Sequence, residues 1–265
     1  MPTGQPDFLA SAASNPTSPS FDSGEDTTRI LMGGGANSRA GRWLWATGFE
    51  ADPLGSGPVN LTSIYGGSGN GSAKIINLIQ TATGALNNSI WQGNQCLQIE
   101  TGGTSGDETV VYKIIPWQNG VGGLECFFNF PFSNPVSCEL KLEITRFDVS
   151  TYNQGRLILV IGSALSNIKL YYDNNGTRTQ ILDAVNYFQG DTRTSWHYIK
   201  LVYDAINKVY VRAYFDNLLF SLAGIAGYTT STTLNGDRFA ISLKTTSAVI
   251  KDVWIDNMIL TGDEP

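Results

Sequence analysis

The chain has 265 residues, 42% of them hydrophobic, which is enough for one large β domain or two small ones with a substantial core. Charged residues make up 15%, and the net charge of −6 disfavours a protein that binds nucleic acid through its phosphates. No window approaches the roughly 18 uninterrupted apolar residues of a membrane-spanning helix, and residues 1–15 lack the basic and apolar regions of a secretory signal. We therefore expect no nucleic-acid partner, no membrane insertion and no signal-directed export.

Residues 1–40 differ in composition from the rest of the chain. Four of the ten prolines stand at positions 2, 6, 16 and 19. The large apolar residues of this stretch follow neither a helical nor a strand period, so the stretch cannot bury itself. We expect an extended N-terminal arm, held by neighbouring subunits, that precedes a β domain over residues 41–265. The predicted arm contacts are Phe8, Leu9, Phe21, Ile30 and Leu31.

From residue 41 onward, short β-type runs alternate with Gly, Asn, Asp and Ser clusters, which is typical of an all-β sandwich or barrel. About a dozen strands are too many for one small sheet, so we expect two packed antiparallel sheets. The Asn175-Gly176 step predicts a tight hairpin, and a short polar loop within 201–210 predicts another. The predicted strands are 43–49, 74–79, 96–100, 109–115, 124–130, 138–146, 156–161, 168–172, 178–182, 196–203, 209–215, 238–243 and 249–260.

Cysteine and histidine restrict the chemistry. The three cysteines, Cys96, Cys126 and Cys138, are an odd number without the C-x-x-C spacing of a zinc or redox site, so we expect reduced, buried thiols. His197 is the sole histidine and lies inside a strand-like run. Because no nucleophile motif such as G-x-S-x-G accompanies it, we interpret it as structural.

Two neighbouring segments carry a family resemblance. Ser195-Trp-His-Tyr-Ile-Lys-Leu-Val-Tyr-Asp204 is followed by Lys208-Val-Tyr-Val-Arg-Ala-Tyr-Phe-Asp-Asn217. Together they resemble the laminin-G and concanavalin A-like lectin/glucanase superfamily, in which a Trp-His strand leads through a hairpin into a strand ending in Asp-Gly or Asp-Asn. The segments 45–50 and 253–260 look like the first and last strands of the same jelly roll. The resemblance implies a two-sheet antiparallel jelly-roll sandwich whose first and last strands lie side by side, with a concave face where relatives bind or cleave carbohydrate.

The strand 138–146 tests the enzyme hypothesis. Glucanases of the superfamily carry a Glu-x-Asp-x-Glu pattern, and this chain has Glu139 and Glu143 at that separation with Lys141 in the middle. A cation between two carboxylates lowers their pKa values, which is the opposite of what a general acid requires. We therefore expect no enzyme but an outward ladder of alternating charge on a solvated strand face, with a glycoside hydrolase as a distant alternative.

A lectin needs an aromatic platform for a sugar ring and amide or carboxylate groups for its hydroxyls. Each candidate also has a structural interpretation, since Asn-rich loops are what hairpins need. Oxygen ligands for calcium are plentiful in these loops, but no Asp-spaced motif indicates it, so we expect no cofactor. The candidate carbohydrate-binding residues are Tyr65, Trp117, Asn119, Asp173 and Asn174.

An unusual arm, a charge-poor β body and the lack of a catalytic constellation favour an assembly subunit. Gly48-Phe-Glu50 and Ile255-Asp-Asn257 also look like the opening and closing segments of concanavalin A-like domains in bacteriophage structural proteins. Our first hypothesis is a non-enzymatic virion protein, a capsid decoration or appendage subunit made in the host cytoplasm. Its expected partners are other virion proteins or copies of itself, as a homo-oligomer, and host-surface glycans. The alternative is a carbohydrate-binding lectin module.

Overall fold

The computed structural model describes residues 42–49, 52–59, 61–66, 71–76, 95–115, 120–130, 137–148, 151–162, 167–174, 176–185, 196–230 and 236–264. Their regular structure is entirely β-strand. In these ranges no helix is long and apolar enough to cross a membrane. The predicted arm, with Phe8, Leu9, Phe21, Ile30 and Leu31, lies outside the described residues.

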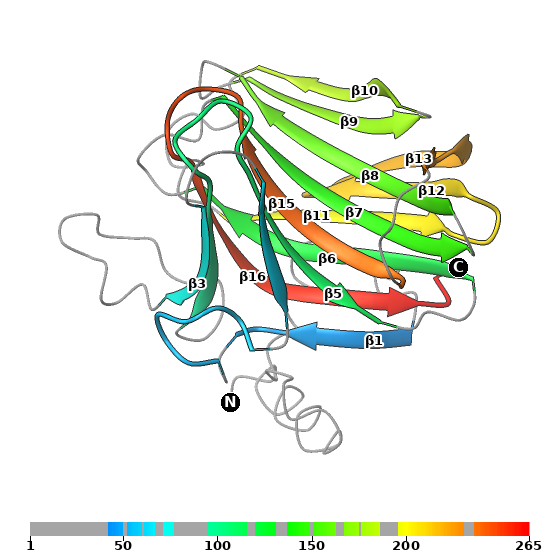
Figure 1. Ribbon diagram of the computed structural model, residues 1–265. Coiled ribbons are helices and arrows are strands. Elements are labelled where there is room, and N and C mark those ends of the chain that lie inside the picture. Colours follow the sequence, from blue (N-terminus) through cyan, green and yellow to red (C-terminus); the bar gives the residue numbers. More distant parts are fainter. Residues whose placement is uncertain are drawn as a thin grey trace, which may run out of the picture.

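The strands form two antiparallel sheets stacked as layers (Figure 1). Sheet A has the order β13 (Leu218–Ala226), β12 (Val209–Phe215), β11 (His197–Asp204), β6 (Val121–Asn129), β16 (Asp252–Gly262), β4 (Cys96–Glu100) and β3 (Ser72–Ile76), with β1 (Arg42–Thr47) also paired to β16. Sheet B has the order β10 (Thr177–Ala184), β9 (Ile168–Asn174), β8 (Thr151–Ile161), β7 (Cys138–Asp148), β15 (Arg238–Thr245), β5 (Glu108–Ile114) and β2 (Thr62–Gly66), with β14 (Tyr228–Thr230) also paired to β8.

The hydrophobic core lies between the sheets because each strand points alternate side chains inward. On β7, Leu140, Leu142 and Ile144 are fully buried and pack against inward residues of sheet A such as Leu124 and Phe128. The all-β, two-sheet antiparallel prediction is therefore confirmed.

The pairing of the first and last strands agrees with the predicted jelly roll. The first strand β1 pairs with the last strand β16, with Trp45 opposite Leu260. Both predicted hairpins are present. Gly176 has the positive φ of 83° that the β9–β10 turn requires. In the β11–β12 turn the Asp204 carboxylate accepts the backbone N–H groups of Ile206 and Asn207.

Three observed strands were not predicted. β2 lies in a Gly- and Ser-rich stretch, β14 has three residues, and β13 lacks alternation of polar and apolar residues. One predicted strand began too early, since β16 starts at Asp252, while Val249 lies in a bend and both Val249 and Ile250 are exposed. Local pattern alone does not determine these boundaries.

The prediction of buried, reduced cysteines is confirmed. Cys96, Cys126 and Cys138 are all buried, and none of them forms a disulfide. Burial raises the pKa of the Cys138 thiol to about 12, so this side chain stays protonated and unreactive at neutral pH.

Candidate functional site

A network of charged side chains lies on the outer face of sheet B, centred on β7. As predicted, Glu139, Lys141 and Glu143 point away from the core, but the prediction of a solvated ladder is wrong. Glu143 is only 6% exposed, because arginines of neighbouring strands lie against it. The Arg178 guanidinium likewise binds Glu139 through two hydrogen bonds of 2.7 and 2.9 Å.

Strand register builds the centre of this network from two adjacent rows that run across the sheet. One row places Tyr112, Ala240, Glu143 and Arg156 opposite one another on four neighbouring strands. The next row consists of Ile114, Arg238, Thr145, Gln154 and Tyr228. Neighbouring strands lie about 4.8 Å apart, so side chains of one row are in direct reach of one another.

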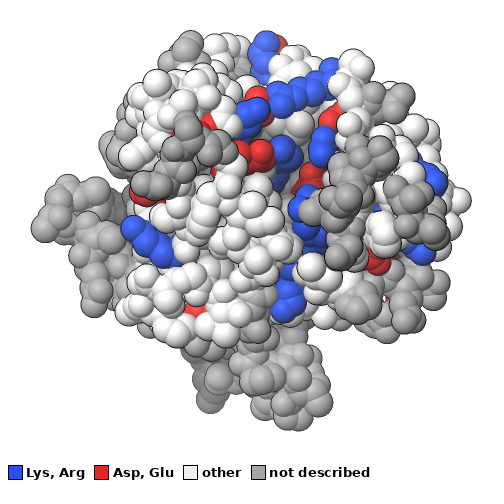
Figure 2. Space-filling model, in the orientation of Figure 1, with Lys and Arg blue, Asp and Glu red and all other residues white. Residues whose placement is uncertain are grey.

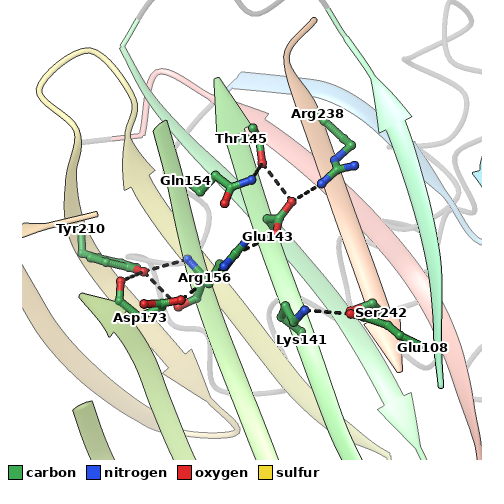
Figure 3. A network of polar contacts seen from close by, with 10 residues as sticks. All are labelled: Glu108, Lys141, Glu143, Thr145, Gln154, Arg156, Asp173, Tyr210, Arg238 and Ser242. Carbon is green, nitrogen blue, oxygen red and sulfur yellow. Dashed lines mark hydrogen bonds and ion pairs between the residues drawn. The ribbon is translucent and has the colours of Figure 1, made fainter. Parts of the chain in front are cut away.

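Glu143 is the hub that joins the two rows (Figure 3). Its carboxylate accepts the Arg156 Nε–H at 2.9 Å, a hydrogen bond from Arg238 Nη2, and the Thr145 hydroxyl at 3.0 Å. Gln154 Nε2 donates in turn to the Thr145 hydroxyl oxygen at 3.3 Å. Burial alone would raise the pKa of Glu143, but Arg156 and Arg238 outweigh it and hold the pKa below its ordinary value. An ionised, doubly paired carboxylate is unsuited to act as a general acid.

The network extends across the sheet to β9 on one side and to β5 on the other. Arg156 Nη1 lies 3.3 Å from Asp173 Oδ2 on β9, and Lys141 Nζ lies 2.7 Å from Glu108 Oε1 on β5. The Ser242 hydroxyl donates to the same Glu108 oxygen at 2.6 Å. These contacts leave the carboxylates as fixed ion-pair partners on the sheet surface.

Tyr210 of sheet A forms hydrogen bonds to the backbone of the strands that carry this surface. Its hydroxyl accepts the backbone N–H of Arg156 at 2.8 Å and donates to the backbone carbonyl of Asp173 at 2.8 Å. Burial raises the pKa of Tyr210, so the hydroxyl remains a donor at neutral pH. The opposite sheet thereby fixes where β8 and β9 present Arg156 and Asp173.

Three polar atoms of the network have no hydrogen-bond partner. They are Gln154 Oε1, Asp173 Oδ1 and Arg238 Nε. The Gln154 and Asp173 residues are only 3% and 7% exposed. All three atoms have almost no solvent-accessible surface, and leaving each one unpaired costs about 1–3 kcal/mol.

Two tyrosines flank these atoms. The Arg156 guanidinium lies 4.9 Å from the centre of the Tyr228 ring, and that of Arg238 lies 5.5 Å from the Tyr112 ring. Figure 2 shows the charged side chains as a band across this face, bordered by uncharged surface. Exposed aliphatic side chains, Ile64 and Ile114, belong to the β2 and β5 strands beside the band.

The sugar candidates that lie within the described residues do not form one cluster. Asp173 joins the network, but from within β9 and largely buried instead of from the predicted loop, and Asn174 ends the same strand. Tyr65 is about half exposed on β2, at the opposite end of the sheet order. Trp117 and Asn119 lie outside the described residues. The central residues Gln154, Arg156 and Arg238 were missed, because only strand register reveals their proximity.

His197 has the surroundings expected for a structural histidine. Its Nδ1 lies 2.9 Å from Asp216 Oδ2, and Asp216 Oδ1 accepts the backbone N–H of Tyr198 at 2.8 Å. The ring stacks on Phe215 and is buried. The Trp-His and Asp-Asn segments that carry the family resemblance are thus joined by this contact, which fixes the start of β11 to the turn after β12.

Comparisons with known proteins bear on the fold. No protein-family model matches the chain, and no curated protein matches it. Among solved structures, it is similar to a conserved carbohydrate esterase of the Shiga toxin-encoding bacteriophage phi24B, with 15% identity, a TM-score of 0.52, and coverage of 83% of this chain and 98% of that chain. It is also similar to the cellulose-induced protein Cip1, with 9% identity, a TM-score of 0.50, and coverage of 82% and 96%. The fold is a two-sheet antiparallel jelly roll, as the resemblance implied.

Proposed function

We propose that this chain is a non-catalytic carbohydrate-binding module whose binding surface is the outer face of sheet B around Glu143. The observation that carries the proposal is the set of three unpartnered atoms, Gln154 Oε1, Asp173 Oδ1 and Arg238 Nε. Two are acceptors and one is a donor. Sugar hydroxyls both donate and accept hydrogen bonds, so a polyol ligand satisfies these atoms once the side chains that cover them move aside.

The surroundings of these atoms also favour a sugar. A pyranose ring has an apolar face as well as hydroxyl groups, and the polar network is flanked by Tyr112 and Tyr228. Arg156 and Arg238 are held by Glu143, so the donor groups are fixed before a ligand arrives. Such preorganisation reduces the entropy cost of binding.

The state of the carboxylates supports a non-catalytic role. Glu139 and Glu143 are both paired with arginines, and Lys141 is paired with Glu108. The depressed pKa of Glu143 opposes proton donation to a leaving group. Hydrolysis of a β-glucan or of a sugar ester by the wild-type chain, lost in Glu139→Gln, would contradict this part of the proposal.

The direct experiment is a glycan array on the full chain, followed by calorimetric titration of the best ligand. Gln154→Met removes the unpartnered acceptor at nearly constant volume and should weaken binding about tenfold or more. Gln98→Met, on the outer face of sheet A, is the matched control and should bind normally. Absence of any glycan ligand would overturn the proposal. Loss of binding in Trp117→Ala but not in Gln154→Met would move the site to the loop predicted from sequence.

A second proposal concerns the biological setting, a virion structural protein anchored by residues 1–40. It is supported by the composition of that stretch and by the bacteriophage origin of one similar structure. On this proposal the β body projects from the particle and presents sheet B to host-surface glycans. A chain lacking residues 1–40 should fold but fail to join the particle, whereas normal incorporation would contradict an anchoring arm.

A further inference from the structure

The outermost strands of the two sheets differ in how well they are protected. An edge strand presents unpaired N–H and C=O groups, and proteins usually blunt it with charge, proline, a bulge or short length. β10 carries Arg178 and Asp183 and a register shift between Gln180 and Leu182. β3 contains Lys74, and both β3 and β2 have five residues. These three edges are therefore protected.

β13 at the edge of sheet A carries no charged residue and no proline, and its register shift lies beyond Ser221. Its nine residues, Leu218-Leu-Phe-Ser-Leu-Ala-Gly-Ile-Ala226, include no charge and no proline. Leu218 to Ser221 pair regularly with β12, whereas the register shifts between Ser221 and Ile225, where Gly224 has a positive φ. The segment from Leu218 to Ser221 thus offers a regular, uncharged edge next to its single described neighbour, β12.

The two faces of β13 have different surroundings. Leu222 is buried, and Phe220 packs against the core. Leu219 on the other face is 53% exposed, and Ser221 is also exposed. The inner side chains hold the strand in place, its outer side chains are exposed, and no other described strand pairs with its second edge.

We propose that β13 is an assembly edge at which two copies of this chain pair antiparallel, about a two-fold axis near Phe220. The two A sheets then form one continuous sheet. A two-fold axis perpendicular to the sheet keeps outer residues beside outer residues, so Leu219 faces Ser221 of the second copy and Phe220 faces its own equivalent. Because the strand is uncharged, the same sequence meets itself without like-charge repulsion. The outer face of sheet B is not used, so this proposal stands or falls separately from carbohydrate binding.

Sedimentation velocity of the full chain over a range of concentrations tests the proposal. We expect a dimer, and we expect Leu219→Lys combined with Ser221→Lys to convert it to a monomer with little change in unfolding temperature. The matched control is Thr177→Lys combined with Gln180→Lys on the charged edge β10, which should remain dimeric. A wild-type monomer throughout, or a dimer that persists in the β13 variant, would overturn the proposal.

Cross-linking identifies the strand's partner. The native cysteines are buried, so an introduced thiol on β13 is the accessible one. An equal mixture of Leu219→Cys and Ser221→Cys chains should form a disulfide between unlike chains on mild oxidation, because facing residues come within disulfide range. The two lysine substitutions on β13 could abolish the dimer while the cysteine mixture forms no cross-link. In that case another segment, such as residues 1–40 of a neighbour, occupies the edge, and self-pairing is overturned.

Discussion

The outer faces of the two sheets both carry acid–base networks, but they differ in enclosure. On sheet A, Lys200 is 0% exposed and lies 3.0 Å from Glu125 and 2.7 Å from Glu264, beside a cluster of buried aromatic side chains. On sheet B, Arg156 and Arg178 keep part of their surface in solvent. The ion-pair network is therefore fully buried on sheet A and partly exposed to solvent on sheet B.

This difference in enclosure indicates different roles for the two networks. Fully enclosed charges must neutralise one another, because an unpaired buried charge costs several kcal/mol. On sheet A, Glu264 accordingly also binds Arg212 at 2.7 Å. In the half-open network of sheet B, Gln154 Oε1 and Asp173 Oδ1 are buried without a hydrogen-bond partner, beneath an Arg156 side chain that is 24% exposed. We interpret the first network as part of the framework and the second as the binding surface.

Breaking the enclosed network should have the largest effect on stability. Lys200→Met leaves Glu125 and Glu264 without their shared cation, and we expect a loss of about 3–5 kcal/mol in the free energy of unfolding, measured in urea. Lys169→Met is the control, since Lys169 is 43% exposed in its side chain and pairs with the equally open Asp183. It should change stability by less than about 1 kcal/mol. Equal effects of the two substitutions would remove the distinction between the networks.

Neutralising the hub of the open network should have an intermediate effect. Since Arg156 and Arg238 lower the pKa of folded Glu143 below 4.5, its ionised form stabilises the fold above that pH, and the contribution disappears as pH falls through the lower folded-state value. Glu143→Gln should cost about 1–3 kcal/mol at pH 7. The difference from wild type should shrink in thermal melts below about pH 4. If the stability difference between Glu143→Gln and wild type does not depend on pH, the ionised pair is not its cause.

The smallest expected effect is a gain in stability instead of a loss, and it concerns Asp252 on sheet A. Burial raises the pKa of Asp252, although Gln98 Nε2 donates to its carboxylate at 3.1 Å. A raised carboxyl pKa means that the folded state loses stability as pH rises through that value. Asp252→Asn should therefore stabilise the protein slightly at pH 7, by less than about 1 kcal/mol, and the gain should fade in melts at acid pH. Destabilisation at pH 7 would contradict this.

Much of the fold could be predicted from the sequence because the information is local. Strict alternation identified β7, and the apolar and aromatic runs gave β4 and β12 with their observed bounds. The same alternation correctly assigned Leu140 and Leu142 to the core. β13 was missed because an edge strand with one anchored face and several small residues lacks that pattern.

The candidate site could not be predicted because it depends on register between distant segments. Glu143 and Arg238 are 95 positions apart, and only the β7–β15 pairing brings them together. The expectation of a solvated Glu139 failed for the same reason, since Arg178 reaches it from β10. Asp173 was identified by residue type and a nearby turn, but its role comes from Arg156 and Tyr210.

A crystal structure of the full chain with the oligosaccharide that binds best on the array would test the central interpretation most directly. It should show sugar hydroxyls within hydrogen-bonding distance of Gln154 Oε1, Asp173 Oδ1 and Arg238 Nε, beside Tyr112 or Tyr228. A sugar bound at Tyr65, or on the outer face of sheet A, would contradict it.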